Sequence, residues 1–170
     1  NANMRRVYDK FKEEPNFLIL SHTCMPETDS VPLLKAYEAK MINGALTKNE
    51  DGSYKIEYDS ATNHKPPTGP FGQTTNTNWN FVTGDKASLY KMARQSYKID
   101  NNEPDSTQNM ADQFIHTQFF ALVDNQRRVR GIYDGLKEDE VQKLFKDIKG
   151  LLKEKIVPKR FMNGFSNNPN

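Results

Sequence analysis

The sequence predicts an α/β fold with a mixed sheet flanked by helices. Three observations predict it: short apolar runs typical of buried strands, amphipathic helical segments between them, and a strand–turn–strand unit followed by a last helix. The chain of 170 residues is long enough for one domain with a hydrophobic core. We therefore expect one domain over residues 1–155, with an insertion at 43–78, and a C-terminal extension over 156–170.

The opening of the chain predicts a helix, a strand and a second helix. Residues 3–12 place apolar side chains on one helical face, and 17–20 form a continuous apolar run. Asp29 or Ser30 can cap a helix over 31–42. The first helix has no evident cap, so we expect that the chain is truncated within the fold.

Residues 43–78 differ in composition from the segments on either side, because they are rich in Asn, Thr, Gly, Pro and Lys. Alternating apolar residues at 54, 56 and 58 predict one short exposed strand there. A loop of this length in a compact domain is usually a functional or decorative insertion. The isolated His64 has no neighbours at ligand spacing, which favours decoration.

The second half predicts a strand at 79–82, a helix over 86–97, a hairpin of strands at 114–123 and 129–133, and a helix over 137–155. This order matches the thioredoxin fold without its first core strand.

Composition and charge exclude several classes of protein. The 24 basic and 22 acidic residues are interspersed, which disfavours a nucleic-acid binder. No apolar run approaches the roughly 20 residues that cross a bilayer. Cys24 is the only cysteine, so the chain cannot form an internal disulfide or a Cys-x-x-Cys pair.

His116 is the first candidate for chemistry. It lies at the entry to the first hairpin strand, among apolar residues, where an imidazole can ligate a metal ion through one nitrogen. The alternative is a core histidine whose hydrogen bonds are satisfied, and the local sequence favours that alternative.

His22 and Cys24 form a second candidate site. If the strand continues to Cys24, the two side chains share a face and can activate a thiolate or bind a soft metal. Two ligands do not complete a site, however, and a lone cysteine is usually a small buried residue.

The remaining charged residues have structural explanations. Asp29 fits a capping role before a helix, and acidic residues at 138–140 complement a helix dipole. Arg127, Arg128 and Arg130 fit the exposed face of a hairpin, or a docking patch for an acidic partner.

Several segments in order resemble the Sco/SenC family of thioredoxin-like copper proteins. The resemblance rests on 17–40 with its loop Cys24-Met25-Pro26-Glu27-Thr28-Asp29, on 79–86, and on hairpin segments at 114–117, 122–124 and 131–135. It implies a metallochaperone rather than an enzyme, one that helps assemble the copper centre of cytochrome c oxidase by delivering copper or by reducing its cysteines. It also implies a parent anchored to a membrane, facing the periplasm or the mitochondrial intermembrane space.

In that family, two cysteines of a C-x-x-x-C-P motif and one distant histidine bind copper, and His116 matches the histidine by position. The two cysteines would precede the first helix and are absent from this sequence. We therefore expect copper or thiol–disulfide chemistry in the full-length parent and impaired copper binding in this chain. The alternatives are a thioredoxin-like reductase or peroxidase relative, and a non-catalytic interaction module.

The missing strand would lie between the strand at 17–21 and the hairpin strand at 118–123. Its absence leaves two unpaired strand edges. We expect a swapped segment of a second copy, a strand at 53–58, or direct pairing of the flanking strands to fill the slot, and favour self-association.

Overall fold

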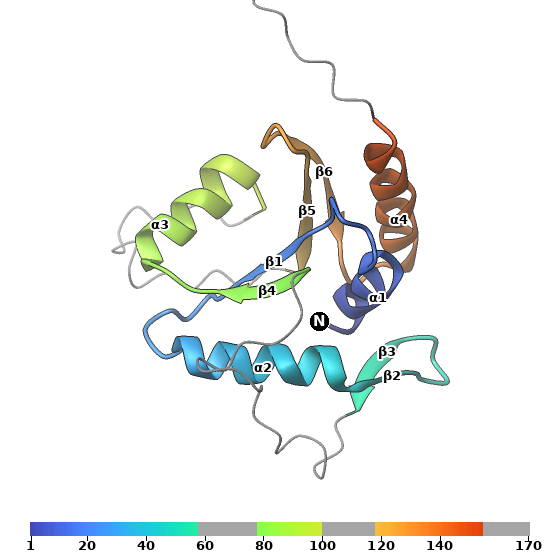
Figure 1. Ribbon diagram of the computed structural model, residues 1–170, viewed down its shortest axis with the longest axis horizontal. Helices are drawn as coiled ribbons and strands as arrows, with labels where there is room; N and C mark the ends of the chain where they lie inside the picture. Colours follow the sequence, from blue (N-terminus) through green and yellow to red (C-terminus); the bar gives the residue numbers. More distant parts are fainter. Residues whose placement is uncertain (58–77, 100–117, 155–170) are drawn as a thin grey trace, which may run out of the picture.

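The structure is a computed structural model that describes residues 1–57, 78–99 and 118–154 (Figure 1). The chain runs helix, strand, helix and then three strands, followed by two consecutive helical segments, a hairpin and a last helix. In order, the elements are α1 (Ala2–Phe11), β1 (Ile19–His22), α2 (Val31–Asn43), β2 (Ala45–Lys48), β3 (Tyr54–Glu57), β4 (Trp79–Val82), α3 (Lys86–Lys91), the π-helix η1 (Met92–Tyr97), β5 (Phe119–Val123), β6 (Val129–Asp134) and α4 (Glu138–Leu152).

The strands pair in both parallel and antiparallel fashion, which confirms the predicted mixed α/β class. β1 and β4 are parallel, with Ile19 opposite Trp79. β2 pairs with β3, and β5 with β6, both antiparallel. The parallel pair is the framework of the site described below, because its carboxyl end carries the loop that leads into α2.

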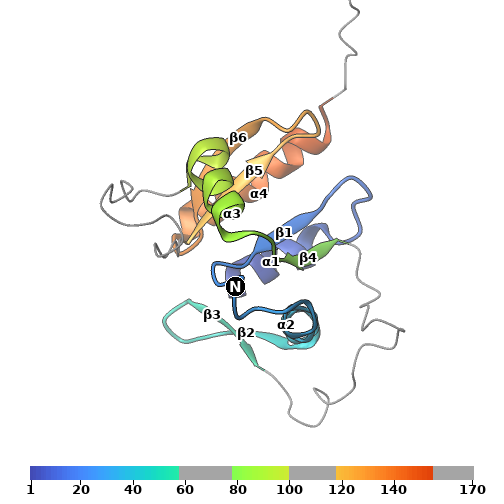
Figure 2. The ribbon, with the colours of Figure 1, turned by 90° about the vertical axis from the view of Figure 1, so that its left-hand side faces the viewer.

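The helices cover different sides of these strands. Figure 1 shows α1 and α4 side by side, with α2 running along the outside of β4. Figures 1 and 2 together place α3 on the side of the β5–β6 hairpin that is opposite α4. Within the described ranges, every helix is too short or too polar to cross a bilayer.

Trp79 lies at the centre of the core and is completely buried. Its ring contacts those of Tyr8 and Phe81, with centroids 5.5 and 5.3 Å apart. Its indole nitrogen donates a hydrogen bond of 2.9 Å to the Ser21 hydroxyl, so the buried donor is satisfied. The other buried core residues come from α1, β1, α2, β6 and α4: Val7, Phe11, Ile19, Leu34, Met41, Tyr133, Val141, Leu144, Phe145 and Ile148.

Glu38 is a fully buried carboxylate on α2. It accepts a hydrogen bond of 3.0 Å from the backbone N–H of Phe81, and the ammonium of Lys35 donates to both its oxygens at 3.0–3.2 Å. Burying a carboxylate is tolerated only when such partners replace water. Glu38 therefore fixes α2 against β4.

Two arginines of α1 bind the ends of other helices. The Arg5 guanidinium donates to the carbonyls of Met41 and Gly44 at 2.6 and 2.9 Å, which satisfies the C-terminal end of α2. The Arg6 guanidinium forms a bidentate pair with Glu138 at 2.6 and 2.7 Å, at the first turn of α4.

Three elements differ from the sequence-based expectation. The first strand occupies Ile19–His22 rather than 17–20, because its ladder partners on β4 begin at Trp79. The helix expected over 86–97 changes from α to π after Lys91. Part of the expected insertion at 43–78 is the β2–β3 hairpin, which packs against α1; residues 58–77 lie outside the described ranges.

The strand at 54–57 does not fill the predicted slot in the sheet. β3 pairs with β2, so that part of the prediction was wrong. Direct pairing of the flanking strands was also wrong, since β1–β4 and β5–β6 are separate sheets in the described chain. Within Phe17–Leu20, the backbone N–H of Ile19 donates to the Asn78 carbonyl at 2.8 Å. Filling by a second copy stays a prediction.

We predict that Glu38→Ala destabilises the fold by about 3 kcal/mol, because Lys35 and the Phe81 N–H lose a buried partner. The free energy of unfolding from urea titrations measures this. Glu57→Ala is the matched control: its side chain is 53% exposed, and its pair with Lys55 contributes less than about 1 kcal/mol. Equal effects of the two substitutions would contradict the role assigned to Glu38.

We also predict that stability falls as pH drops from about 4.5 to about 2. Hydrogen bonds from Arg6 and Gln142 lower the pKa of Glu138 to about 2. Burial raises the pKa of Asp124, but hydrogen bonds from the Arg128 and Arg130 side chains and nearby backbone outweigh it and lower that pKa to about 2. A carboxylate whose pKa is lower when folded stabilises the protein above its unfolded pKa, and this contribution is lost as it protonates.

Denaturant titrations at pH 5.5 and pH 3 measure this loss. Glu138→Gln should make stability less dependent on pH, because one of the two linked carboxylates is gone. Asp139→Asn, in the same helical turn, is the control and should leave the dependence unchanged. A wild-type protein equally stable at both pH values would contradict the prediction.

Candidate functional site at the carboxyl end of β1

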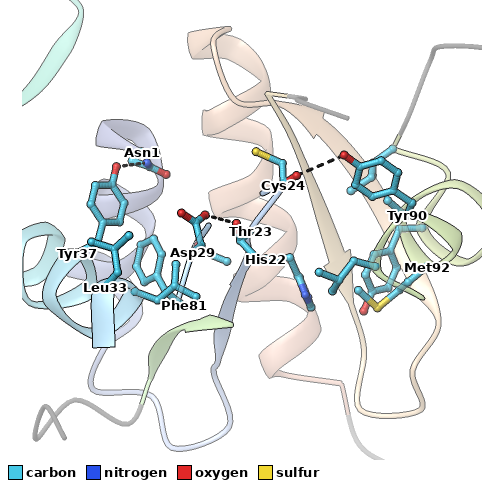
Figure 3. Close-up of a pocket in the computed structure, with 16 residues that line it drawn as sticks. Asn1, His22, Thr23, Cys24, Asp29, Leu33, Tyr37, Phe81, Tyr90 and Met92 are labelled. Atoms are coloured by element: carbon cyan, nitrogen blue, oxygen red, sulfur yellow. Dashed lines mark hydrogen bonds between the residues drawn. The ribbon is translucent and has the colours of Figure 1, made fainter. Parts of the chain in front are cut away.

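A pocket of about 500 Å³ opens where β1 ends (Figure 3). The segment that leaves β1, the start of α2, the end of β4 and the helices α3 and η1 contribute its walls. The pocket also reaches the N-terminal end of α1, where the Asn1 side-chain amide donates to the Tyr37 hydroxyl at 2.8 Å. Loops and helix ends gather here because the carboxyl ends of parallel strands meet at one edge of a sheet.

The loop after β1 is held by Thr23. Its backbone N–H donates to the Val82 carbonyl at 3.0 Å, which extends the ladder by one bond. Its hydroxyl donates to the carboxylate of Asp29 and accepts from the Met25 N–H at 2.9 Å. Asp29 is thereby held at the pocket, and the residue that caps α2 is Ser30, whose hydroxyl accepts from a first-turn N–H at 3.4 Å.

His22 and Cys24 both line the pocket but do not form a paired site. β1 ends at His22, so the strand does not continue to Cys24 as their predicted contact required. Figure 3 shows the imidazole and the thiol directed apart. His22 is an exposed residue as a whole, but partial desolvation of its imidazole lowers the pKa of His22. The lowered pKa favours the neutral imidazole near pH 7.

Tyr90 anchors the far wall of the pocket. It is 2% exposed, and its hydroxyl donates to the Cys24 carbonyl at 3.3 Å. The π-helix that follows α3 contributes Met92 and Tyr97 to the lining. Short π-helical segments are rare and occur often at functional sites, so this wall is a second sign of function in the same place.

The described part of the chain offers no group of three or more His, Cys, Asp or Glu side chains that could hold a metal ion. One imidazole and one thiol directed apart do not fit Cu(I), which needs converging soft ligands. His116, the copper ligand expected from the family resemblance, lies outside the described residues, as does His64.

Two of the three arginines of the hairpin form ion pairs within the chain. Arg128 and Arg130 both pair with Asp124, at 2.7 and 3.3 Å, and Arg130 also pairs with Glu154 at 2.6 Å. These contacts support the structural interpretation of the two residues. Arg127 lies in the turn itself, with a positive φ of 62°.

Sequence reasoning missed the pocket residues Asp29, Tyr37, Tyr90 and Tyr97 as a group. The local sequence predicts a capping role for Asp29 and assigns no site role to Tyr37 or Tyr97. The sequence did contain a signal, because these tyrosines lie on the two helices predicted over 31–42 and 86–97. The signal points to a shared site only once the pairing of β1 with β4 is known.

The chain is similar to a known protein family and to solved structures of that family. The profile described as SCO1/SenC matches residues 57–153. Two similar solved structures are a SCO1/SenC family lipoprotein from Bacillus anthracis and BsSco, a member of the Sco family of cytochrome c oxidase assembly proteins. The first is 22% identical, with a TM-score of 0.55 over 88% of this chain and 69% of the other. The second is 23% identical, with a TM-score of 0.56 over 91% and 70%.

A search of curated proteins found no match. The similarity to solved Sco proteins confirms the predicted thioredoxin-like α/β fold. The family profile covers more than half of the sequence, including both strands of the β5–β6 hairpin and all of α4. The chain belongs to the SCO1/SenC family.

Proposed function

We propose that this chain is the thioredoxin-like domain of a protein that assists assembly of the copper centre of cytochrome c oxidase, through copper binding or thiol–disulfide exchange. The observation that carries the proposal is the SCO1/SenC match over residues 57–153, a range that includes His116. The similarity to BsSco, described as a member of a family of cytochrome c oxidase assembly proteins, agrees with it.

Copper is the cargo in this proposal, and His116 is one of its ligands. The partner ligands are the two cysteines that the family pattern puts immediately before α1. Two thiolates and an imidazole suit Cu(I), and the same two thiols can exchange disulfides. In this proposal the chemistry depends on those cysteines, and no group of three or more His, Cys, Asp or Glu side chains among the described residues offers another metal site.

The proposed partner is the copper-containing subunit of the oxidase, or another protein with copper or thiols to exchange. We propose that the parent is anchored to a membrane and faces the periplasm or cell envelope. The description of one similar structure as a lipoprotein supports this location.

The direct test is Cu(I) binding by the chain extended with the residues that its gene encodes before Asn1. Competition with a Cu(I) chelator should show one tight equivalent in the extended protein. His116→Ala should weaken its affinity at least tenfold, on the order of what perturbing a metal's ligand sphere costs, whereas His64→Ala should not. An extension without cysteines, or tight binding that His116→Ala leaves intact, would refute the proposal.

For the 170-residue chain itself, we predict weak Cu(I) binding, because the described residues offer no converging ligand set and Cys24 is the only thiol. A stoichiometric amount of chelator should remove the metal. One tight equivalent that is lost on His116→Ala would show that the missing cysteines are not needed. Joint dependence on His22 and Cys24 would instead assign the metal to those two residues.

We further predict that the chain does not catalyse disulfide reduction. A dithiol reductase resolves its mixed disulfide with a second cysteine, and Cys24 has none in this sequence. Insulin reduction with dithiothreitol should proceed at the same rate with and without the chain. Catalysis that survives Cys24→Ser would be incompatible with this reasoning.

A further inference from the structure

The pocket at the end of β1 combines an apolar, aromatic wall with one negative charge. Its volume of about 500 Å³ is within the range of pockets that bind ligands, roughly 300–1,000 Å³. Most of its wall is aliphatic or aromatic, from Leu33, Tyr37, Phe81, Tyr90, Met92 and Tyr97. Such a wall removes water from whatever enters, which strengthens electrostatic interactions inside.

Asp29 is the one charged side chain among the described residues that line the pocket. Thr23 donates a hydrogen bond to one carboxylate oxygen, and no cationic group of the described chain forms an ion pair with either. The nearby Glu27, by contrast, is paired with Lys86 at 3.0 Å.

The other titratable groups of the lining do not compensate this charge. Desolvation lowers the pKa of His22, so its positive form is disfavoured. Among the described residues that line the pocket, no cationic side chain therefore balances the charge of Asp29. A cation is the ligand that this electrostatic arrangement favours.

The mouth of the pocket resembles a protein-binding surface. Leu33 and Tyr37 line the pocket and yet are 53% and 38% exposed. Met25 and Val31, also large and exposed, lie in the same loop and at the start of the same helix. Exposed apolar side chains gathered around a polar centre are typical of surfaces that bind other proteins.

We propose that this pocket is a docking site for a basic side chain, lysine or arginine, presented by a partner protein. The aliphatic stem of that side chain contacts Leu33 and the aromatic wall, and its ammonium or guanidinium group pairs with Asp29. The ring of Tyr37 is held by the Asn1 hydrogen bond and by edge-to-face packing on Phe81, with centroids 5.3 Å apart. It offers a fixed face to the cation.

This proposal goes beyond the proposed function, because it requires neither copper nor a thiol. It assigns to Asp29 the recognition of a partner, and to the loop after β1 the positioning of that carboxylate. The charge pair provides specificity and the apolar rim provides contact area.

The experiment is a titration of the ¹⁵N-labelled chain at pH 7.5 with acetylated, amidated tripeptides Gly-X-Gly, followed by NMR. X is arginine or lysine, and the neutral isosteres citrulline and norleucine are the matched probes. We expect saturable shifts at the backbone amides of Thr23, Asp29 and Tyr97 with the two basic probes, and about tenfold weaker binding of the neutral ones. Binding should also weaken as salt is added.

Two variants test the residues. Asp29→Asn retains an oxygen that accepts from Thr23 and should weaken the arginine probe about tenfold, whereas Glu27→Gln should not. Tyr37→Leu should weaken both basic probes by removing the ring. Equal binding of arginine and citrulline peptides to the wild-type chain would overturn the proposal, and so would the absence of saturable shifts. The first comparison requires no substitution, so it holds even if a variant fails to fold.

Discussion

Two consecutive arginines of α1 join parts of the chain that are far apart in sequence. Arg5 binds the carbonyls at the end of α2, and Arg6 forms a bidentate pair with Glu138 at the start of α4. The opposite face of the same helix buries Val7 and Phe11 in the core. Helix α1 therefore connects the end of α2 to the start of α4, and β1 and β4 lie near these helices (Figure 1).

The position of α1 also determines where the pocket forms. Asn1, the residue before α1, lines the pocket and donates to the Tyr37 hydroxyl, so the start of α1, the start of α2 and the end of β1 meet at one place. In the proposed function, the two cysteines expected before α1 would enter at this same place. A partner that docks by a basic side chain at Asp29 would then be held beside the chemistry proposed for the full-length protein.

Two acidic residues only nine positions apart serve different purposes because their surroundings differ. Glu38 is fully buried and is matched by Lys35 and a backbone N–H, so it contributes to the packing of α2 on β4. Asp29 faces the pocket with one hydrogen bond from Thr23 and no ion pair in the described chain. A matched buried carboxylate stabilises a fold, whereas an unmatched one beside an apolar wall is available to a ligand.

The sequence by itself determined the helices and most strands, because periodicity encodes which face of an element is buried; α1, α4 and β4 lie where the pattern predicted them. It also determined that Cys24 has no partner cysteine. Tertiary structure decided what pairs with each strand, so β3 joined β2 and β1 ended before Cys24. It also showed that Ser30 caps α2 and that Asp29 lines the pocket. Strand pairing and pocket formation depend on contacts between residues distant in sequence, and local patterns carry no information about them.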